Sequence, residues 1–190
     1  MNPLALLQVI TTAAPLFGKL AEMMFTDDGY IRSYYFEVNK NLDVLKTIDI
    51  KSLKDEEITS PAFQKIITSL ETEIGASLLF KDLKKHKKIF NLLNTTLEIC
   101  GDDKNDLTLE TDDDTAEQKS APKQVTVQVL RAMWFTINKI ELLKTLSTLD
   151  GTTFRHTFRL NVRLYNIEER LKQIRIQLTQ FDAVQQIIHG

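Results

Sequence analysis

Hydrophobic side chains recur along most of this chain at alternating intervals of three and four residues, which is the spacing of an amphipathic helix. The pattern covers stretches at about residues 30–48, 61–100, 125–149 and 160–188. Ser60-Pro61 is a helix-start signal, whereas Gly101 and Asp150-Gly151 are helix-stop signals. Helices of about 25 to 35 residues would be roughly 40–50 Å long, which suits an elongated bundle. We find no convincing alternating strand run and no internal repeat.

Two stretches keep this alternation long enough to predict seams that pack against other helices. The seam positions are Leu79, Leu83, His86, Phe90, Leu93, Leu97 and Cys100 in the first stretch and Leu160, Leu164, Ile167, Leu171, Ile174, Leu178 and Phe181 in the second. Gly75 lies inside the pattern, which predicts a bend or a close helix contact there. We therefore predict one all-α domain over residues 1–190, an elongated bundle of about four to six helices that are mostly antiparallel, with coiled-coil-like seams.

Residues 3–25 are the most apolar stretch, with no charged side chain before Lys19. On a helical wheel their polar residues fall within an arc of about 100°, and the rest of the circumference is apolar. Pro15 lies on the polar stripe and should kink the helix. The wide apolar face must be covered by the protein's own core, by a partner or by lipid. The candidate partner-binding or membrane-binding residues are Leu6, Leu7, Ile10, Leu16, Phe17, Leu20 and Met24.

The same stretch is a poor signal peptide and a poor transmembrane span. It lacks a positively charged start, and polar residues interrupt its apolar run. Cys100 is the single cysteine, so an internal disulfide is excluded and a reducing compartment is favoured. We therefore expect a cytoplasmic protein, with membrane association through the first helix as an alternative.

Residues 101–124 break the helical pattern completely. They carry eight acidic residues before Lys119 and have no periodic apolar face. The spacing of these carboxylates does not match a calcium loop, which needs a glycine at its sixth position and a glutamate at its twelfth. We interpret the segment as a disordered, solvated acidic linker.

The sequence contains none of the motifs that would indicate common catalytic or cofactor chemistry. Phosphate-binding glycine loops, an H-E-x-x-H zinc motif and a G-x-S-x-G nucleophile elbow are all missing. The histidines, His86, His156 and His189, lie far apart and have no ligand-spaced neighbours. We therefore predict a protein that is not an enzyme and that uses no cofactor, metal ion or small-molecule substrate.

Two groups of basic residues are candidates for an anionic partner. The first comprises Lys81, Lys84, Lys85, Lys87 and Lys88, and the second comprises Arg155, Arg159, Arg163 and Arg170. Each has an ordinary interpretation beside the functional one. The lysines can form a solvated face or bind the acidic linker. The arginines can pair with glutamates across the bundle while their stems cover apolar surface.

The pattern as a whole favours a non-catalytic bundle that acts by binding another protein or its own copies, as a subunit, adaptor or regulator. The alternative is a membrane-active bundle whose N-terminal helix inserts into a bilayer or lies on it, although interfacial helices usually carry a basic polar face that this one lacks. A further alternative is an accessory protein that binds nucleic acid through the lysine cluster or the arginine stripe, and it is disfavoured because no aromatic residues interleave with the arginines.

Overall fold

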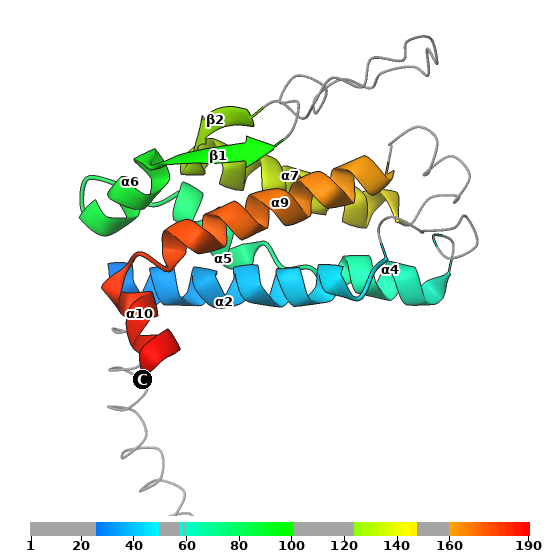
Figure 1. The fold of residues 1–190 in the computed structure, drawn as a ribbon, viewed down its shortest axis with the longest axis horizontal. Helices are drawn as coiled ribbons and strands as arrows, with labels where there is room; N and C mark the ends of the chain where they lie inside the picture. Colours follow the sequence, from blue (N-terminus) through cyan, green and yellow to red (C-terminus); the bar gives the residue numbers. More distant parts are fainter. Residues whose placement is uncertain (1–25, 50–57, 59, 101–123, 148–159) are drawn as a thin grey trace, which may run out of the picture.

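The computed structural model describes residues 26–49, 58, 60–100, 124–147 and 160–190, and helices dominate it (Figure 1). The helices are α2 (Asp27–Lys46), α4 (Pro61–Thr68), α5 (Glu73–Leu79), α6 (Lys87–Asn94), α7 (Val129–Leu146), α9 (Leu160–Leu178) and α10 (Asp182–His189), and the strands are β1 (Thr96–Cys100) and β2 (Gln124–Gln128). The prediction of an all-α bundle is therefore confirmed, with a small antiparallel sheet added to it.

The core lies between α2, α7 and α9. Helix α9 packs against both α2 and α7, and β1 also contacts α9. Ile31 and Leu42 on α2, Met133 on α7, and Leu164 and Ile174 on α9 are almost completely buried. These residues come from the stretches with three-and-four spacing, so one buried face on each helix accounts for most of the core.

Two helix starts are fixed by side-chain caps. The Thr26 hydroxyl accepts a hydrogen bond from the Gly29 amide at 3.1 Å and caps α2. The Ser60 hydroxyl accepts one from the Phe63 amide at 3.1 Å and caps α4, with Pro61 at the first helical position. The start predicted at Ser60-Pro61 is thus confirmed.

The prediction that residues 61–100 are helical up to Gly101, with a bend or a close contact at Gly75, is correct only in part. The chain leaves the helix after α4, again after α5, and forms strand β1 after α6. Strand β1 pairs antiparallel with β2, from Thr96 opposite Gln128 to Cys100 opposite Gln124. Leu97 and Ile99 are buried while Glu98 between them is exposed. This alternation is only five residues long, so the longer helical spacing masked it.

The C-terminal seam also divides, because α9 ends at Leu178 and α10 begins at Asp182. Helix α10 then packs on the start of α2, where the Arg32 side chain donates to the Ala183 carbonyl at 3.0 Å and to Gln186 Oε1 at 2.7 Å. The longest described helix, α2, has 20 residues, so the expected helices of about 25 to 35 residues are not observed in the described ranges.

Several predictions fall on other parts of the chain. The apolar stretch 3–25, most of the acidic linker 101–124, and Arg155 and Arg159 lie outside the described residues. Among the described helices, none combines the length and the hydropathy needed to cross a bilayer.

Candidate functional site

The basic segment Lys81–Lys88 lies against the first turn of α2. The Lys81 ammonium sits 3.8 Å from the centre of the Tyr30 ring and donates to the Tyr30 hydroxyl at 2.5 Å. The Lys88 ammonium contacts the two carboxylate oxygens of Asp28 at 2.7 and 2.9 Å. The hydrogen bond to Asp28 raises the pKa of Lys88. These two cations are therefore paired with side chains of α2.

His86 occupies the N-cap position of α6 rather than a seam position within a helix. Its ring nitrogen Nδ1 lies 2.5 Å from Asp27 Oδ1. The other oxygen of Asp27 accepts a hydrogen bond from the Lys88 amide at 2.9 Å, in the first turn of α6. Asp27 thus supplies the acceptor that α6 lacks, because His86 makes no side-chain cap of its own.

The remaining lysines of the segment face solvent. Lys84, Lys85 and Lys87 are exposed. The Lys85 side chain is 80% exposed, and its ammonium is 3.8 Å from Asp82. The predicted lysine patch is therefore split into two lysines that contact α2 and three exposed lysines that do not belong to those contacts.

The arginine stripe is placed differently from the lysines. Arg163 is half-buried, and burial lowers its pKa. Arg170 is only 5% exposed, and its guanidinium lies 5.8 Å from the centre of the Phe135 ring. Arg170 therefore belongs to the contact between α9 and α7 and does not extend the outer surface.

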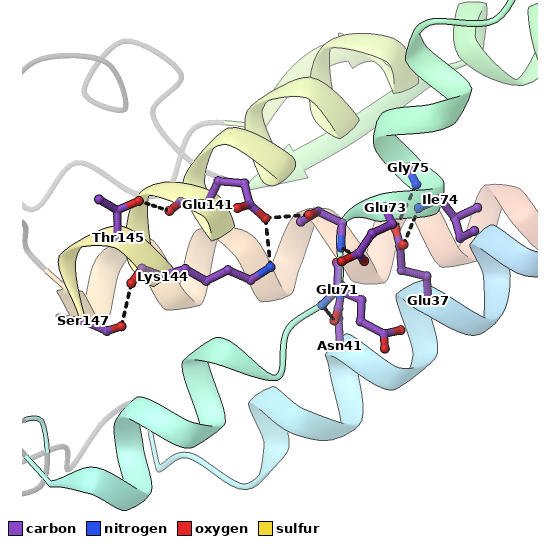
Figure 2. A network of polar contacts seen from close by, with 11 residues as sticks. Glu37, Asn41, Glu71, Glu73, Ile74, Gly75, Glu141, Lys144, Thr145 and Ser147 are labelled. Carbon is purple, nitrogen blue, oxygen red and sulfur yellow. Dashed lines mark hydrogen bonds and ion pairs between the residues drawn. The ribbon is translucent and has the colours of Figure 1, made fainter.

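A polar network connects α2, α5 and α7 (Figure 2). The Glu37 carboxylate on α2 accepts hydrogen bonds from the Ile74 amide at 2.7 Å and the Gly75 amide at 2.9 Å. The Asn41 side chain, one turn further, donates to the Glu71 carbonyl and accepts from the Glu71 amide, both at 2.7 Å. Two adjacent polar side chains of α2 therefore fix the chain that enters α5.

Glu141 and Thr72 connect the same region to α7. The Thr72 hydroxyl donates to Glu141 Oε1 at 2.6 Å, and the Lys144 ammonium donates to the same oxygen at 2.9 Å (Figure 2). Partial burial opposes ionisation of Glu141, but the two donors prevail and lower its pKa. Bonds from its own amide and the Thr72 amide lower the pKa of Glu73.

Burial has the opposite effect on Glu37. This side chain is 5% exposed, and desolvation raises its pKa despite the two amide donors. The sequence carries a signal for Glu37 that the search for motifs does not detect. Glu37 and Asn41 follow Tyr34 and Val38 by three residues, so they lie on the predicted buried face of α2.

Gly75 allows α5 to approach α2 and α7. A Cβ atom at this position would lie 2.9 Å from Tyr34 Cε2, 3.1 Å from Glu37 Oε1 and 3.2 Å from Ile137 Cδ1. The predicted close helix contact at Gly75 is therefore present, whereas the bend in the chain precedes it.

The network is organised as a scaffold. Within the described ranges, no three or more His, Cys, Asp or Glu side chains are grouped so that they could hold a metal ion. The oxygens of Glu37 and the bonded oxygen of Glu141 receive donors from the protein itself. These carboxylates therefore fix helix positions.

The outer face of α7 carries exposed apolar side chains. Trp134 is 48% exposed and Leu130, one turn before it, is 40% exposed. The Trp134 ring packs edge-on against the buried Phe135 ring, with centres 5.3 Å apart. Asn138 continues the same face and donates to the Trp134 carbonyl at 2.7 Å. We call Leu130, Trp134 and Asn138 the α7 face.

No protein-family model, curated protein or solved structure matches the chain. A function for the basic segment or the α7 face therefore cannot be assigned from a similar protein.

Proposed function

We propose that this chain is a non-catalytic helical-bundle protein that acts by binding another protein or a second copy of itself, as a subunit, adaptor or regulator. The observation that carries this proposal is the half-exposed Trp134 on the α7 face. Tryptophan is among the residue types most enriched at the energetic centres of protein interfaces, where it is surrounded by a polar rim.

The surroundings of Trp134 support this assignment. Its ring is held against the buried Phe135, so it loses little conformational freedom when a partner covers it. Leu130 extends the apolar contact along the helix, and the Asn138 amide borders it. The arrangement is that of an apolar anchor with an adjacent polar edge.

The test compares the full-length protein with Trp134→Ala and with the control variant Phe36→Ala. Phe36 is 56% exposed on α2, so the control removes an exposed aromatic ring from another helix. Each variant is used as bait in the native source, and co-purifying proteins are quantified by mass spectrometry. Self-association is followed in parallel by sedimentation.

We expect Trp134→Ala to weaken one specific interaction at least tenfold, which corresponds to about 1.4 kcal/mol or more, while Phe36→Ala retains it. The proposal is refuted if no co-purifying protein depends on Trp134 and the wild-type chain stays monomeric at all concentrations. Unchanged melting temperatures of both variants would show that the fold is intact.

A further inference from the structure

The segment from Phe80 to Lys88 divides its side chains between an anchored set and an exposed set. The anchored side chains are Lys81, Leu83, His86 and Lys88. The exposed set is Phe80, Lys84, Lys85 and Lys87; the Lys88 side chain is also 54% exposed, but its ammonium is paired with Asp28. Contacts to α2 and the core therefore hold the backbone of this segment in place while one aromatic ring and three ammonium groups face solvent.

Phe80 is the most exposed large hydrophobic residue among those described. It is 89% exposed, whereas the next, Phe36, is 56% exposed. It occupies the C-cap position of α5, where the helix has ended and the ring projects from the turn. Single exposed apolar residues are common on protein surfaces, so Phe80 gains significance only from its neighbours.

Those neighbours are strongly cationic, although the whole chain has a net charge of −2. Residues 80–88 contain five lysines and one acidic residue, Asp82. The acidic side chains Asp27 and Asp28 of α2 contact His86 and Lys88, whereas Asp82 lies 3.8 Å from the Lys85 ammonium. Three exposed lysines therefore lie within seven residues of the exposed ring along an anchored segment.

We infer that Phe80, Lys84, Lys85 and Lys87 form a binding site for the surface of an anionic lipid bilayer. A bilayer offers an exposed ring an apolar layer to enter and offers the nearby ammonium groups the anionic headgroups that lie just outside that layer. Single-stranded nucleic acid would instead require successive aromatic platforms along a groove, and this segment presents one fully exposed ring. None of the four residues of this site belongs to the stretch 3–25 or to the α7 face.

The test measures partitioning of the full chain onto sedimentable vesicles. One vesicle type is pure phosphatidylcholine, and the other contains phosphatidylserine as well. The variants are Phe80→Ala and the triple variant Lys84→Gln/Lys85→Gln/Lys87→Gln. The matched controls are Phe36→Ala and Lys46→Gln/Lys65→Gln, whose lysines belong to α2 and α4 at the other end of the bundle (Figure 1).

We expect the wild-type chain to bind the phosphatidylserine vesicles more strongly, and added salt should weaken this binding. Each lysine near such a surface contributes about fivefold, so the triple variant should lose on the order of 100-fold. Loss of the phenyl ring should weaken binding about tenfold or more. Neither control should change it, and all substituted side chains are exposed, so the melting temperatures should stay constant.

Three outcomes would overturn the inference. First, the wild-type chain could bind both vesicle types equally well, or could bind neither of them. The site variants could bind as strongly as the wild type, which would place any membrane contact elsewhere, for example at residues 3–25. Finally, binding of a labelled single-stranded oligonucleotide could depend on Phe80 and the three lysines while binding of the vesicles does not. This result would identify nucleic acid as the partner.

Discussion

Replacing Gly75 with alanine tests the tightest contact in the helix bundle. In an isolated helix this change stabilises by about 1 kcal/mol, because glycine has the greater backbone freedom to lose. Here the added Cβ would lie 2.9 Å from Tyr34 Cε2, closer than real Cβ contacts allow. Tyr34 is 3% exposed, so moving its ring would displace other parts of the core. The helix preference and the packing therefore predict opposite signs for the change in the free energy of unfolding.

Packing should prevail. Forcing one carbon into a filled core costs about 1–3 kcal/mol. The same Cβ would lie 3.1 Å from Glu37 Oε1, which accepts the Gly75 amide at 2.9 Å. Displacing this oxygen weakens a buried hydrogen bond, at a cost of roughly 1 kcal/mol. After the gain in helix propensity, we expect Gly75→Ala to lower the free energy of unfolding by about 1–3 kcal/mol.

Urea unfolding monitored by circular dichroism measures this change, and thermal unfolding should show a fall in melting temperature of roughly 2–12 °C. The neighbouring variant Ala76→Gly should cost about 1 kcal/mol from helix propensity. Ile137→Val removes the Cδ1 atom that would lie 3.2 Å from the added Cβ, so the double variant should lose less than the two single losses combined. If Gly75→Ala is as stable as the wild type, the close packing of α5 between α2 and α7 is refuted.

Two further predictions concern the polar network. Burial raises the pKa of Glu37 above its ordinary value of 4.5, so the folded state binds this proton more tightly than the unfolded state. The free energy of unfolding of the wild type should therefore rise, relative to that of Glu37→Gln, as the pH falls from neutral towards the ordinary value of 4.5. A parallel pH dependence of the two proteins in urea titrations would contradict this. Asn41→Ala should lower the free energy of unfolding by roughly 2–4 kcal/mol, because it leaves both backbone groups of Glu71 without their side-chain partner. A loss below about 0.5 kcal/mol in the same assay would show that water replaces the amide.

The helical faces of this protein could be predicted from the sequence because periodicity is a local signal. Ile31, Leu42, Leu164 and Ile174 all lie on predicted apolar faces, and all are buried. The start at Ser60 was also predictable, because the capping hydroxyl and the amide that it caps are three residues apart. Each of these inferences uses residues that are close in the sequence.

The breaks at residues 80–86 and 95–100 were not predictable in the same way. Leu83 and Leu97 fit a helical seam, yet Leu83 lies in a turn and Leu97 in a strand. Strand β1 forms by pairing with β2, which follows more than twenty residues later. The local hydrophobic spacing of a segment does not show that such a distant partner exists. Spacing of three and four thus indicates which residues are buried more reliably than it indicates the conformation that buries them.

The starts of α5 and α6 have one common explanation in α2. Neither helix has a side-chain cap from its own N-cap residue. Each instead receives a carboxylate from α2: Glu37 accepts two amides at the start of α5, and Asp27 accepts the Lys88 amide at the start of α6. Helices of seven and eight residues are too short to form alone in water, so these contacts help to select where they begin. Because the partners are 37 to 61 residues apart, a search for nearby caps could not find them. Helix α2 therefore acts as the template on which the middle of the chain is ordered, and the basic segment is presented at one end of the bundle as a consequence.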